Sequence, residues 1–216
     1  LLAGGILAVK GIGGIHLACD AGNAGAVERL RRIKHREAKP LAVMCASFRE
    51  AERFCRISGA ERRILESPRR PIVLCEKKQP DSLRELSGNS RLGVMLPYTP
   101  LHVLLLDGAF GGPKTLVMTS ANAPDCPVLT ENEEALSLLK GQIDGFLLHN
   151  RPIENRCDDS LVMEWQGREY FFRRSRGYAP QPVAPASLHV HLVGDANTVG
   201  NLRTVIWRAW DVCMKL

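Results

Sequence analysis

Residues 31–41, R-R-I-K-H-R-E-A-K-P-L, join a cationic segment to the apolar run at 41–44. Six of these eleven positions are Lys, Arg or His. Guanidinium and ammonium groups neutralise phosphate charge, so a cationic loop that enters a buried strand is suited to bind a polyanion. A helix end whose cations complement the helix dipole would explain the same charges. The stretch alone leaves both interpretations open.

The elements before this stretch are expected to be a strand, a glycine cluster and a helix. Residues 5–10 form an apolar run typical of a buried strand, and G-I-G-G follows at 11–14. Asn23 is a suitable helix N-cap, because apolar residues recur at helical spacing from Ala26 to Ile33. We therefore predict a helix that ends near Lys34.

The elements after the stretch alternate between strand and helix. The expected strands are 41–45, 71–74, 92–96, 116–118 and 145–148, and a hairpin pairs 160–165 with 169–173. The expected helices are 47–56, 58–66, 101–106 and 131–140, the last opened by the capping box Thr130-x-x-Glu133. Residues 76–90 are polar and predict an exposed loop. This order indicates an α/β domain with a mixed sheet.

Composition favours a cytosolic globular protein with an anionic partner. The chain has 216 residues, 45% hydrophobic, and a formal net charge of +6 with a pI near 9.1. This charge suggests a nucleotide, a nucleic acid or an acidic protein as partner. Seven cysteines without a C-x-x-C pair are typical of reduced thiols in a cytoplasmic protein, and we expect no structural zinc.

The N-terminal run is not expected to cross or enter a membrane. It is too short to span a bilayer, glycines and Lys10 interrupt it, and no basic segment of a signal peptide precedes it. The chain begins with Leu1 inside a strand-like run. We therefore expect it to be a piece of a longer protein.

Three polar segments could carry chemistry. The glycines at 11, 13 and 14 lack the Walker A and G-x-G-x-x-G spacings, but they would let a ligand approach the backbone; a tight turn explains them as well. T-S-A-N at 119–122 ends a predicted central strand, where open α/β sheets bind ligands, although a turn or N-cap would use the same residues. N-R-C-D-D-S at 155–160 could face Mg²⁺ or a ribose, or could form a turn.

Six motifs in order resemble a known family. They are H-L-A-C-D-A after the glycines, K-H-R-E-A-K-P-L, L-P-Y-T-P-L-H, T-S-A-N, N-R-C-D-D-S and R-R-S-R-G-Y-A-P. Together they resemble the YrdC-like domain, and more narrowly the version in the hydrogenase maturation carbamoyltransferase (HypF) family. The resemblance implies an open twisted mixed parallel and antiparallel sheet with flanking helices. It covers residues 1–182, and 183–216 are expected to be a linker or a divergent tail.

The resemblance implies an adenylate-forming activity. Carbamate and ATP would give carbamoyl-adenylate and pyrophosphate, with Mg²⁺ bridging phosphate oxygens, as part of the enzyme that makes the cyanide ligands of NiFe hydrogenase. The full-length family then delivers the carbamoyl group to an acceptor cysteine of a hydrogenase maturation partner protein. The wider family has T-x-T-V-Y-G-L where this chain has residues 11–17, G-I-G-G-I-H-L. The loss of hydroxyls and the gain of His16 favour carbamate over the larger threonylcarbamate.

The same resemblance implies roles for twelve residues. The expected catalytic residues are Lys34 and Arg36. The expected nucleotide-binding residues are Lys39, Ser120, Asn122, Ser160, Arg174 and Arg176. The expected substrate-binding residues are Lys10, Gly13, Gly14 and His16. No protein metal site is expected, because Mg²⁺ would be held mainly by phosphate.

Three alternatives remain open from the sequence. The chain could be a threonylcarbamoyl-adenylate synthase for tRNA modification. It could be a double-stranded RNA binding module of the same fold, which its charge would allow. It could also be an inactive remnant, which a test of nucleotide binding would separate from the others.

Overall fold

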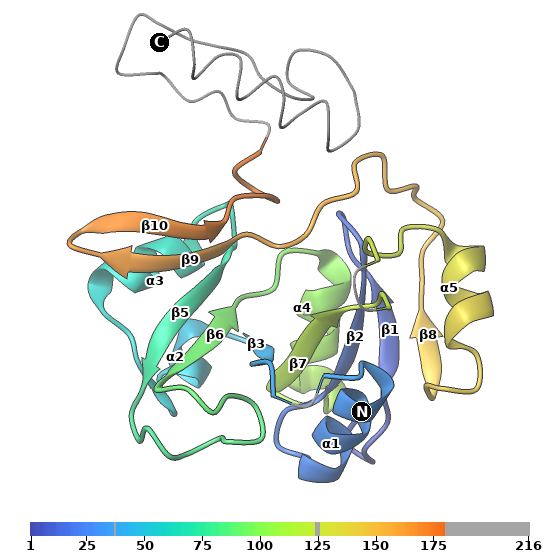
Figure 1. Cartoon of the computed structure of the whole chain (residues 1–216), viewed down its shortest axis with the longest axis horizontal. Coiled ribbons are helices and arrows are strands. Elements are labelled where there is room, and N and C mark those ends of the chain that lie inside the picture. The colour runs from blue at the N-terminus through green and yellow to red at the C-terminus, as the bar shows by residue number, and fades with distance from the viewer. Residues whose placement is uncertain (37, 124–125, 180–216) are drawn as a thin grey trace, which may run out of the picture. The chain divides into compact units, whose positions relative to one another are not determined.

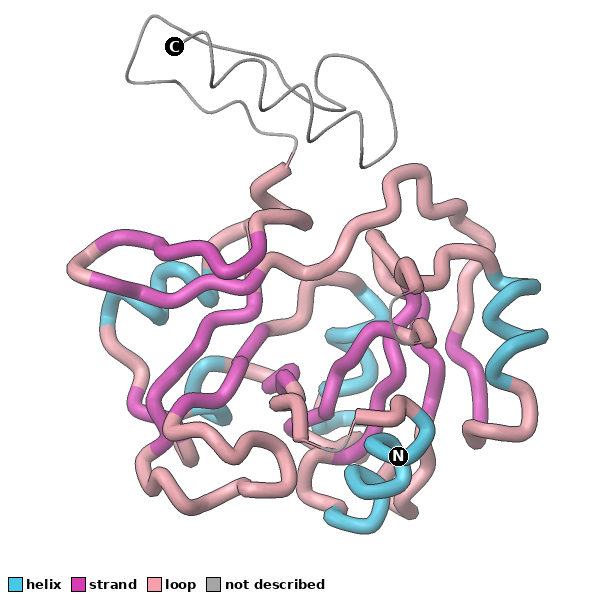
Figure 2. The backbone as a smooth tube through the Cα atoms, viewed as in Figure 1, coloured by secondary structure: helices cyan, strands magenta, loops and turns pink. Residues whose placement is uncertain are grey.

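The computed structural model describes residues 1–179 except 37 and 124–125. The predicted linker or tail at 183–216 lies outside the described residues, so the proposed boundary at 182 stays a prediction. Figure 1 shows the strands side by side in one sheet, and Figure 2 shows helices at its flanks. The mixed α/β architecture predicted from the sequence is confirmed.

The element bounds follow the apolar runs of the sequence. The strands are β1 Leu7–Lys10, β2 Ile15–Asp20, β3 Ala42–Cys45, β4 Cys55–Arg56, β5 Ile72–Lys77, β6 Arg91–Met95, β7 Thr115–Ser120, β8 Gly145–Leu147, β9 Leu161–Trp165 and β10 Arg168–Arg173. The helices are α1 Ala24–Ile33, α2 Phe48–Ala51, α3 Gly59–Glu66, α4 Pro100–Leu106 and α5 Asn132–Leu139, with a 3₁₀ turn at Gly108–Phe110. Asn23 caps α1 through its side chain, and Ser58 with Glu61 forms a capping box at α3.

The sheet has the order β10-β9-β5-β6-β3-β7-β2-β1-β8, with β4 paired to β5. The pairs β1–β8, β3–β6 and β5–β9 are parallel, and the others are antiparallel. In Figure 1 the orange hairpin β9–β10 lies at one edge and yellow β8 at the other. This order brings β2, β3, β5 and β7, which come from distant parts of the sequence, into the middle of one surface.

Alternation along the central strands divides the core between the two faces of the sheet. In β7, Val117 packs into one apolar cluster and Met118 into the other. β3 repeats the pattern with Val43 and Met44. The cluster that contains Met44 and Met118 also contains Leu106 of α4. This second face carries the cleft described below.

Four details of the sequence prediction are wrong. The helix expected at 47–56 ends at Ala51, because Cys55 and Arg56 pair with β5. The strand expected to end at 74 continues to Lys77, whose fully buried ammonium donates to the carbonyls of Ser82 and Ser87. Residues 15–20 were not predicted as a strand, yet they form β2 between β1 and β7.

The predicted capping box at α5 is the fourth error. The helix has Glu131 at its N-cap and no side-chain capping hydrogen bond. Thr130 is instead buried, and its hydroxyl accepts a hydrogen bond from Arg156 at 3.5 Å. The Thr130 hydroxyl thus takes part in a tertiary contact and does not cap the helix.

The cysteines agree with the predicted reduced state in the described part of the chain. Cys19, Cys45, Cys55 and Cys75 are buried free thiols, whereas Cys126 is exposed. Burial raises the pKa of the Cys45 thiol to about 12. These buried thiols therefore contribute to packing and not to chemistry.

Candidate active site

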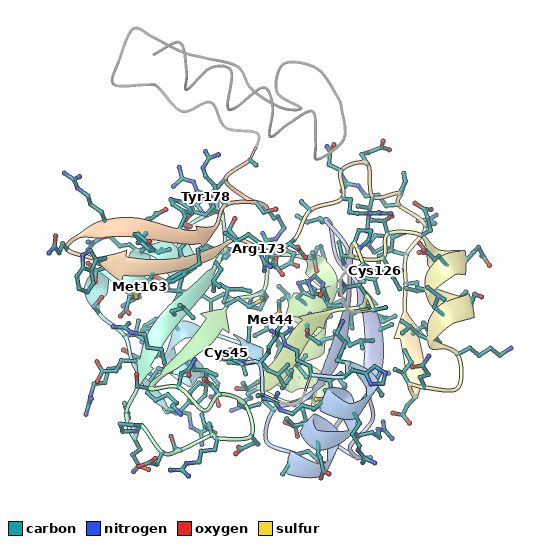
Figure 3. The ribbon with its side chains drawn as sticks, in the orientation of Figure 1. Met44, Cys45, Cys126, Met163, Arg173 and Tyr178 are labelled. Atoms are coloured by element: carbon teal, nitrogen blue, oxygen red, sulfur yellow. The ribbon has the colours of Figure 1, made fainter. Side chains whose placement is uncertain are left out.

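A cleft of about 210 Å³ opens on the sheet face that carries Met118. Its floor is apolar and consists of Leu41, Ala42, Ile72, Leu74, Met118 and Leu161. Its polar lining consists of His16, Arg36, Thr119, Ser120, Asp158, Asp159 and Arg173. In Figure 3, Arg173 lies between the β9–β10 hairpin and the central strands. The cleft therefore has an apolar floor and a rim that carries both positive and negative side chains.

Two arginines face this cleft from opposite ends of the chain. Arg36 donates to the Thr119 hydroxyl at 3.3 Å and to the Pro40 carbonyl at 2.9 Å. Arg173 donates to the Asp159 carbonyl at 2.8 Å and lies 3.7 Å from the Asp158 carboxylate. Among the described residues, no carboxylate lies within ion-pair distance of Arg36.

The electrostatics of Arg36 are those of an anion site. Burial lowers the pKa of Arg36, and repulsion by Arg31 and Arg173 lowers it further. Its Nε atom is buried and has no hydrogen-bond partner in the described structure. An anion in the cleft would relieve the repulsion on the Arg36 guanidinium.

Lys34 holds the segment that follows β7. Its ammonium donates to the Ser120 carbonyl at 2.7 Å and to the Asn122 side-chain oxygen at 3.0 Å, and also contacts the Asn122 carbonyl. Burial, with a smaller effect from Arg36, lowers the pKa of Lys34 to about 8, although Asp158 opposes the shift. All three ammonium hydrogens are thus used within the protein, and Lys34 lies behind Ser120 and not in the open cleft.

Ser120 is the polar group that links Lys34 to the cleft. Its carbonyl accepts from Lys34, and its hydroxyl donates to the Asn122 side-chain oxygen at 2.6 Å. The Asn122 amide in turn donates to the Cys126 carbonyl. The predicted group Lys34, Arg36, Ser120 and Asn122 is therefore brought together at the end of β7.

Arg31 braces the cationic loop. Its guanidinium donates to the carbonyls of Arg36 and Lys39 at 2.9 Å and to those of Glu85 and Leu86. Arg31 lies in the last turn of α1, and these bonds tie the backbone at Arg36 and Lys39 to that helix. Lys39 itself is exposed and does not line the cleft.

A buried ion-pair network forms the other side of the cleft. His16 Nε2 lies 2.9 Å from Asp159 Oδ2, and Arg176 Nε donates to Asp159 Oδ1 at 2.6 Å. Arg176 also donates to the carbonyls of Arg69 and Arg70, and its guanidinium lies 3.5 Å from the centre of the Tyr98 ring. The network crosslinks β2 to the segment after β10.

Asp159 is ionised within this network. Burial alone would raise its pKa, but the hydrogen bond and charge of His16 and the charge of Arg176 outweigh burial and lower the pKa well below the usual range for Asp. The carboxylate is therefore the acceptor from His16 Nε2. Both carboxylate oxygens of Asp159 are thus engaged inside the protein.

Several predicted ligand contacts are not supported by the geometry. Ser160 is fully buried; its hydroxyl donates to the Arg176 carbonyl at 2.9 Å and accepts from the Ser175 amide at 2.8 Å, so no hydroxyl hydrogen is left for phosphate. Lys10 is buried and donates to the His149 carbonyl. Arg176 is committed to the ion-pair network, and Arg174 is exposed and does not line the cleft.

The glycine cluster forms a turn packed against its own chain. The Gly11 amide donates to the Gly14 carbonyl at 2.9 Å, which closes the β1–β2 connection. A Cβ at Gly13 would lie 2.5 Å from the Cys157 carbonyl oxygen, and one at Gly14 would lie 2.4 Å from Val128. The close approach predicted for a ligand is thus made by the protein itself. Neither Gly13 nor Gly14 lines the cleft.

Three residues of the cleft lie in motifs recognised from the sequence but were given no site role there. Arg173, Asp158 and Thr119 line the cleft, yet the assigned arginines were 174 and 176. Arg173 is the last residue of β10, and a cation at a strand end is a signal that could have identified it.

Metal binding by the protein alone has little support in the described residues. No group of three or more His, Cys, Asp or Glu side chains suited to a metal ion occurs there. At the cleft, Asp158 is the carboxylate with spare acceptor capacity, since its contact with Arg173 is long. A divalent cation would therefore need most of its oxygen ligands from a bound substrate and water.

None of the helices in the described part of the chain is both long and apolar enough to cross a membrane.

Comparison with known proteins places this geometry in a family context. The Sua5/YciO/YrdC family model, described as "Telomere recombination", matches residues 1–175. The carbamoyltransferase HypF of Synechocystis sp. is 46% identical over 185 residues, which are 85% of this chain and 24% of that protein. The chain thus spans about a quarter of the length of this relative. The threonylcarbamoyl-AMP synthase of Mus musculus is 33% identical over 126 residues, covering 56% of this chain and 43% of that protein.

A solved structure agrees with this result. A full-length HypF in its phosphate- and nucleotide-bound form superposes with a TM-score of 0.77 at 47% identity, over 84% of this chain and 29% of that chain.

Proposed function

We propose that this chain, which belongs to the Sua5/YciO/YrdC family, is the adenylate-forming domain of a HypF-type carbamoyltransferase. In this proposal it converts carbamate and ATP into carbamoyl-adenylate and pyrophosphate. The resemblance in sequence to HypF proteins over 85% of the chain supports the choice of carbamate. The related HypF structure contains bound phosphate and nucleotide, which supports ATP as the second substrate.

The observation that carries the proposal is the pair of guanidinium groups at one cleft. Arg36 and Arg173 both line it, and repulsion between them contributes to the lowered pKa of Arg36. Triphosphate oxygens between the two groups would replace this repulsion with charge-assisted hydrogen bonds. The apolar floor beneath them would keep water from a labile adenylate.

The reaction requires attack on a phosphorus atom that is shielded by negative charge. A carbamate oxygen forms a bond to the α-phosphorus, the bond from that phosphorus to the bridging oxygen of the β-phosphate breaks, and pyrophosphate leaves with the electron pair. Arg36 and Arg173 would hold the phosphate oxygens in line and stabilise the developing charge. Ser120 would orient the carbamate or the α-phosphate from the end of β7.

Lys34 would bind phosphate by replacing one of its bonds to Ser120 or Asn122 with a bond to a phosphate oxygen. Its ammonium contacts three oxygens of Ser120 and Asn122 in this structure. A phosphate at the cleft would compete for one of these hydrogens, since a charge-assisted bond to phosphate is stronger than a bond to a neutral carbonyl. Phosphate binding would in this way be linked to the position of the segment after β7.

Mg²⁺ is part of the proposal as the partner of the triphosphate. It would neutralise phosphate charge and would be held mainly by phosphate oxygens and water, with Asp158 as the adjacent carboxylate.

The test is exchange of labelled pyrophosphate into ATP, which requires reversible adenylate formation. Wild-type protein is expected to catalyse this exchange only when ammonium carbamate is present. Lys34→Ala and Arg36→Ala are each expected to abolish it, whereas Arg32→Ala, a control at an exposed position of α1, keeps it. Wild-type rates in Lys34→Ala would contradict its catalytic assignment, and carbamate-independent exchange would contradict the reaction.

The wider reaction is proposed for the whole protein. There the carbamoyl group would pass to an acceptor cysteine of a hydrogenase maturation partner protein in the cytoplasm, towards the cyanide ligands of NiFe hydrogenase. The 24% of the HypF relative that this chain matches supports only the adenylation step.

The identity to a threonylcarbamoyl-AMP synthase favours one alternative. Exchange that depends on threonine and bicarbonate, and not on carbamate, would support that enzyme. The net charge of +6 favours a second alternative, binding of double-stranded RNA. RNA binding that weakens steeply with salt, without ATP binding, would support it.

A further inference from the structure

His16 occupies a defined place beside the group that would contact the acid. It lies opposite Ser120 in the pairing of β2 with β7, so both side chains lie on the same face of the sheet. Both line the cleft. In the proposed function, Ser120 orients the carbamate or the α-phosphate that the carbamate attacks, so either role places the acid beside Ser120. His16 therefore borders the acid end of the cleft.

The His16 ring is held by a hydrogen bond and by burial. Its Nε2 atom is bound to Asp159, and its Nδ1 atom is buried without a partner in the described structure. A Cβ built on Gly11 would lie 3.5 Å from the Cε1 atom of His16 and 3.4 Å from the Tyr98 hydroxyl. Gly11 has no such side chain, so it is burial and the bond to Asp159 that leave the ring little freedom to turn towards a substrate.

Arg176 extends this fixation into the protein. It holds the second oxygen of Asp159, donates to the Arg69 and Arg70 carbonyls and stacks on Tyr98. Asp159 and Arg176 are both about nine-tenths or more buried. The bonds from Arg176 to Asp159 and from Asp159 to His16 Nε2 hold the imidazole in one position. The ring therefore acts as a fixed steric boundary and not as a mobile hydrogen-bond donor.

We propose that His16, held by Asp159 and Arg176, determines substrate specificity by limiting the acid end of the cleft to a small acid. Asp159 and Arg176 are then positioning residues that act through His16. This inference rests on the proposed function and adds the physical basis of its substrate choice. An acid with a side chain, such as the threonylcarbamate of the related AMP synthases, would collide with the imidazole.

The test compares two acids in pyrophosphate–ATP exchange: carbamate, and threonine with bicarbonate. His16→Ala is expected to raise KM for carbamate about tenfold, with KM for ATP unchanged, and to gain threonine-dependent exchange that wild type lacks. His16→Gln keeps the bulk and a donor for Asp159, so it is expected to keep the exclusion of threonine. Loss of carbamate activity in His16→Ala without a gain for threonine would overturn the inference.

A double-mutant cycle tests the positioning role. Asp159→Asn is expected to reduce discrimination between the acids in the wild-type background and to have no further effect in His16→Ala. Effects that multiply would show that Asp159 does not act through His16. Asp81→Asn, an exposed control, is expected to change neither acid. If Asp159→Asn does not fold, the contrast between His16→Ala and His16→Gln decides alone.

The outcomes separate this inference from the proposed function. No carbamate-dependent exchange by wild type overturns the proposed function and the inference together. Exchange by wild type with no gain for threonine in His16→Ala overturns the inference alone.

Discussion

Two arginines differ in how their charge is balanced: Arg176 holds Asp159, which lines the cleft, and Arg36 lines the cleft itself. Arg176 is buried, paired with Asp159 and stacked on Tyr98. Arg36 faces the cleft, with neutral partners in Thr119 and Pro40 and a buried Nε that lacks an acceptor in the described structure. The first is complete without a ligand, and the second is not.

The balance of charge around an arginine distinguishes a structural arginine from a ligand-binding one more reliably than residue type does. A cation whose charge is balanced inside the protein has no electrostatic reason to bind phosphate. A cation that is repelled by its neighbours, as Arg36 is by Arg31 and Arg173, gains from any anion that enters. Four predictions test whether individual residues contribute to stability or to ligand binding.

The largest expected effect is on stability, at Asp159. Asp159→Ala leaves the buried Arg176 without its carboxylate, and we expect a loss of about 3–5 kcal/mol in the free energy of unfolding, measured by urea denaturation. Since the pKa of Asp159 is lowered in the folded protein, its contribution is present above the unfolded pKa of about 3.9 and is lost as the pH falls further.

The control for this prediction is Asp81→Ala. Asp81 pairs with Arg84 at the surface, so its loss should leave stability nearly unchanged. A loss at Asp159 as small as at Asp81 would show that the buried network is not what holds the cleft wall.

Lys34 should show its burial as a dependence of stability on pH. Its pKa of about 8 in the folded chain is below the unfolded value of about 10.4, so the unfolded chain binds more protons between these values. Stability should therefore rise with pH over this window, by about 3 kcal/mol relative to Lys34→Met, which does not titrate. The measurement is urea unfolding at pH 7 to 11.

Saturating ATP should flatten this pH dependence, because phosphate raises the pKa of the ammonium. If ATP leaves the pH dependence of stability unchanged, Lys34 has a structural role, as Arg176 does, and does not bind phosphate.

Arg36 should affect binding and not stability. Arg36→Gln is expected to weaken ATP binding by about 10- to 100-fold, or about 1.5–3 kcal/mol, since it removes charge-assisted hydrogen bonds. The free energy of unfolding should change by less than about 1 kcal/mol, because the substitution also removes repulsion with Arg31 and Arg173. Calorimetric titration with ATP measures the first, and urea unfolding the second.

The matched control is Arg32→Gln on the exposed side of α1. A comparable loss of affinity there would show that net charge, and not the Arg36 position, drives binding.

Most of the fold could be predicted because it depends on local patterns. Asn23 at the N-cap of α1 and the apolar run of β7 are visible in the sequence. β4 was missed because a two-residue strand exists only through pairing with β5, which local sequence does not encode. Lys77 was assigned to a loop because its burial depends on carbonyls five and ten residues away.

The site was predicted less completely, for a geometric reason. The segment at 173–176 offers three arginines, and the register shifts between Phe171 and Arg173 where β10 pairs with β9. Such a bulge changes which residue faces the cleft, and the letters R-R-S-R do not show the bulge; the position of Arg173 at the end of the strand was the available signal. Arg173 therefore reaches the cleft, whereas Arg176, which was expected to contact the nucleotide, supports His16 through Asp159.

The smallest expected effects distinguish two serines that were both predicted to bind phosphate. The Ser160 hydroxyl is buried between the Arg176 carbonyl and the Ser175 amide, so Ser160→Ala should cost about 1–2 kcal/mol of stability and leave ATP affinity within about twofold. The Ser120 hydroxyl lies at the cleft, so Ser120→Ala should reduce exchange activity with a smaller loss of stability. The reverse result would place Ser160 among the ligands, and would require the segment that carries Arg176 to rearrange when nucleotide binds.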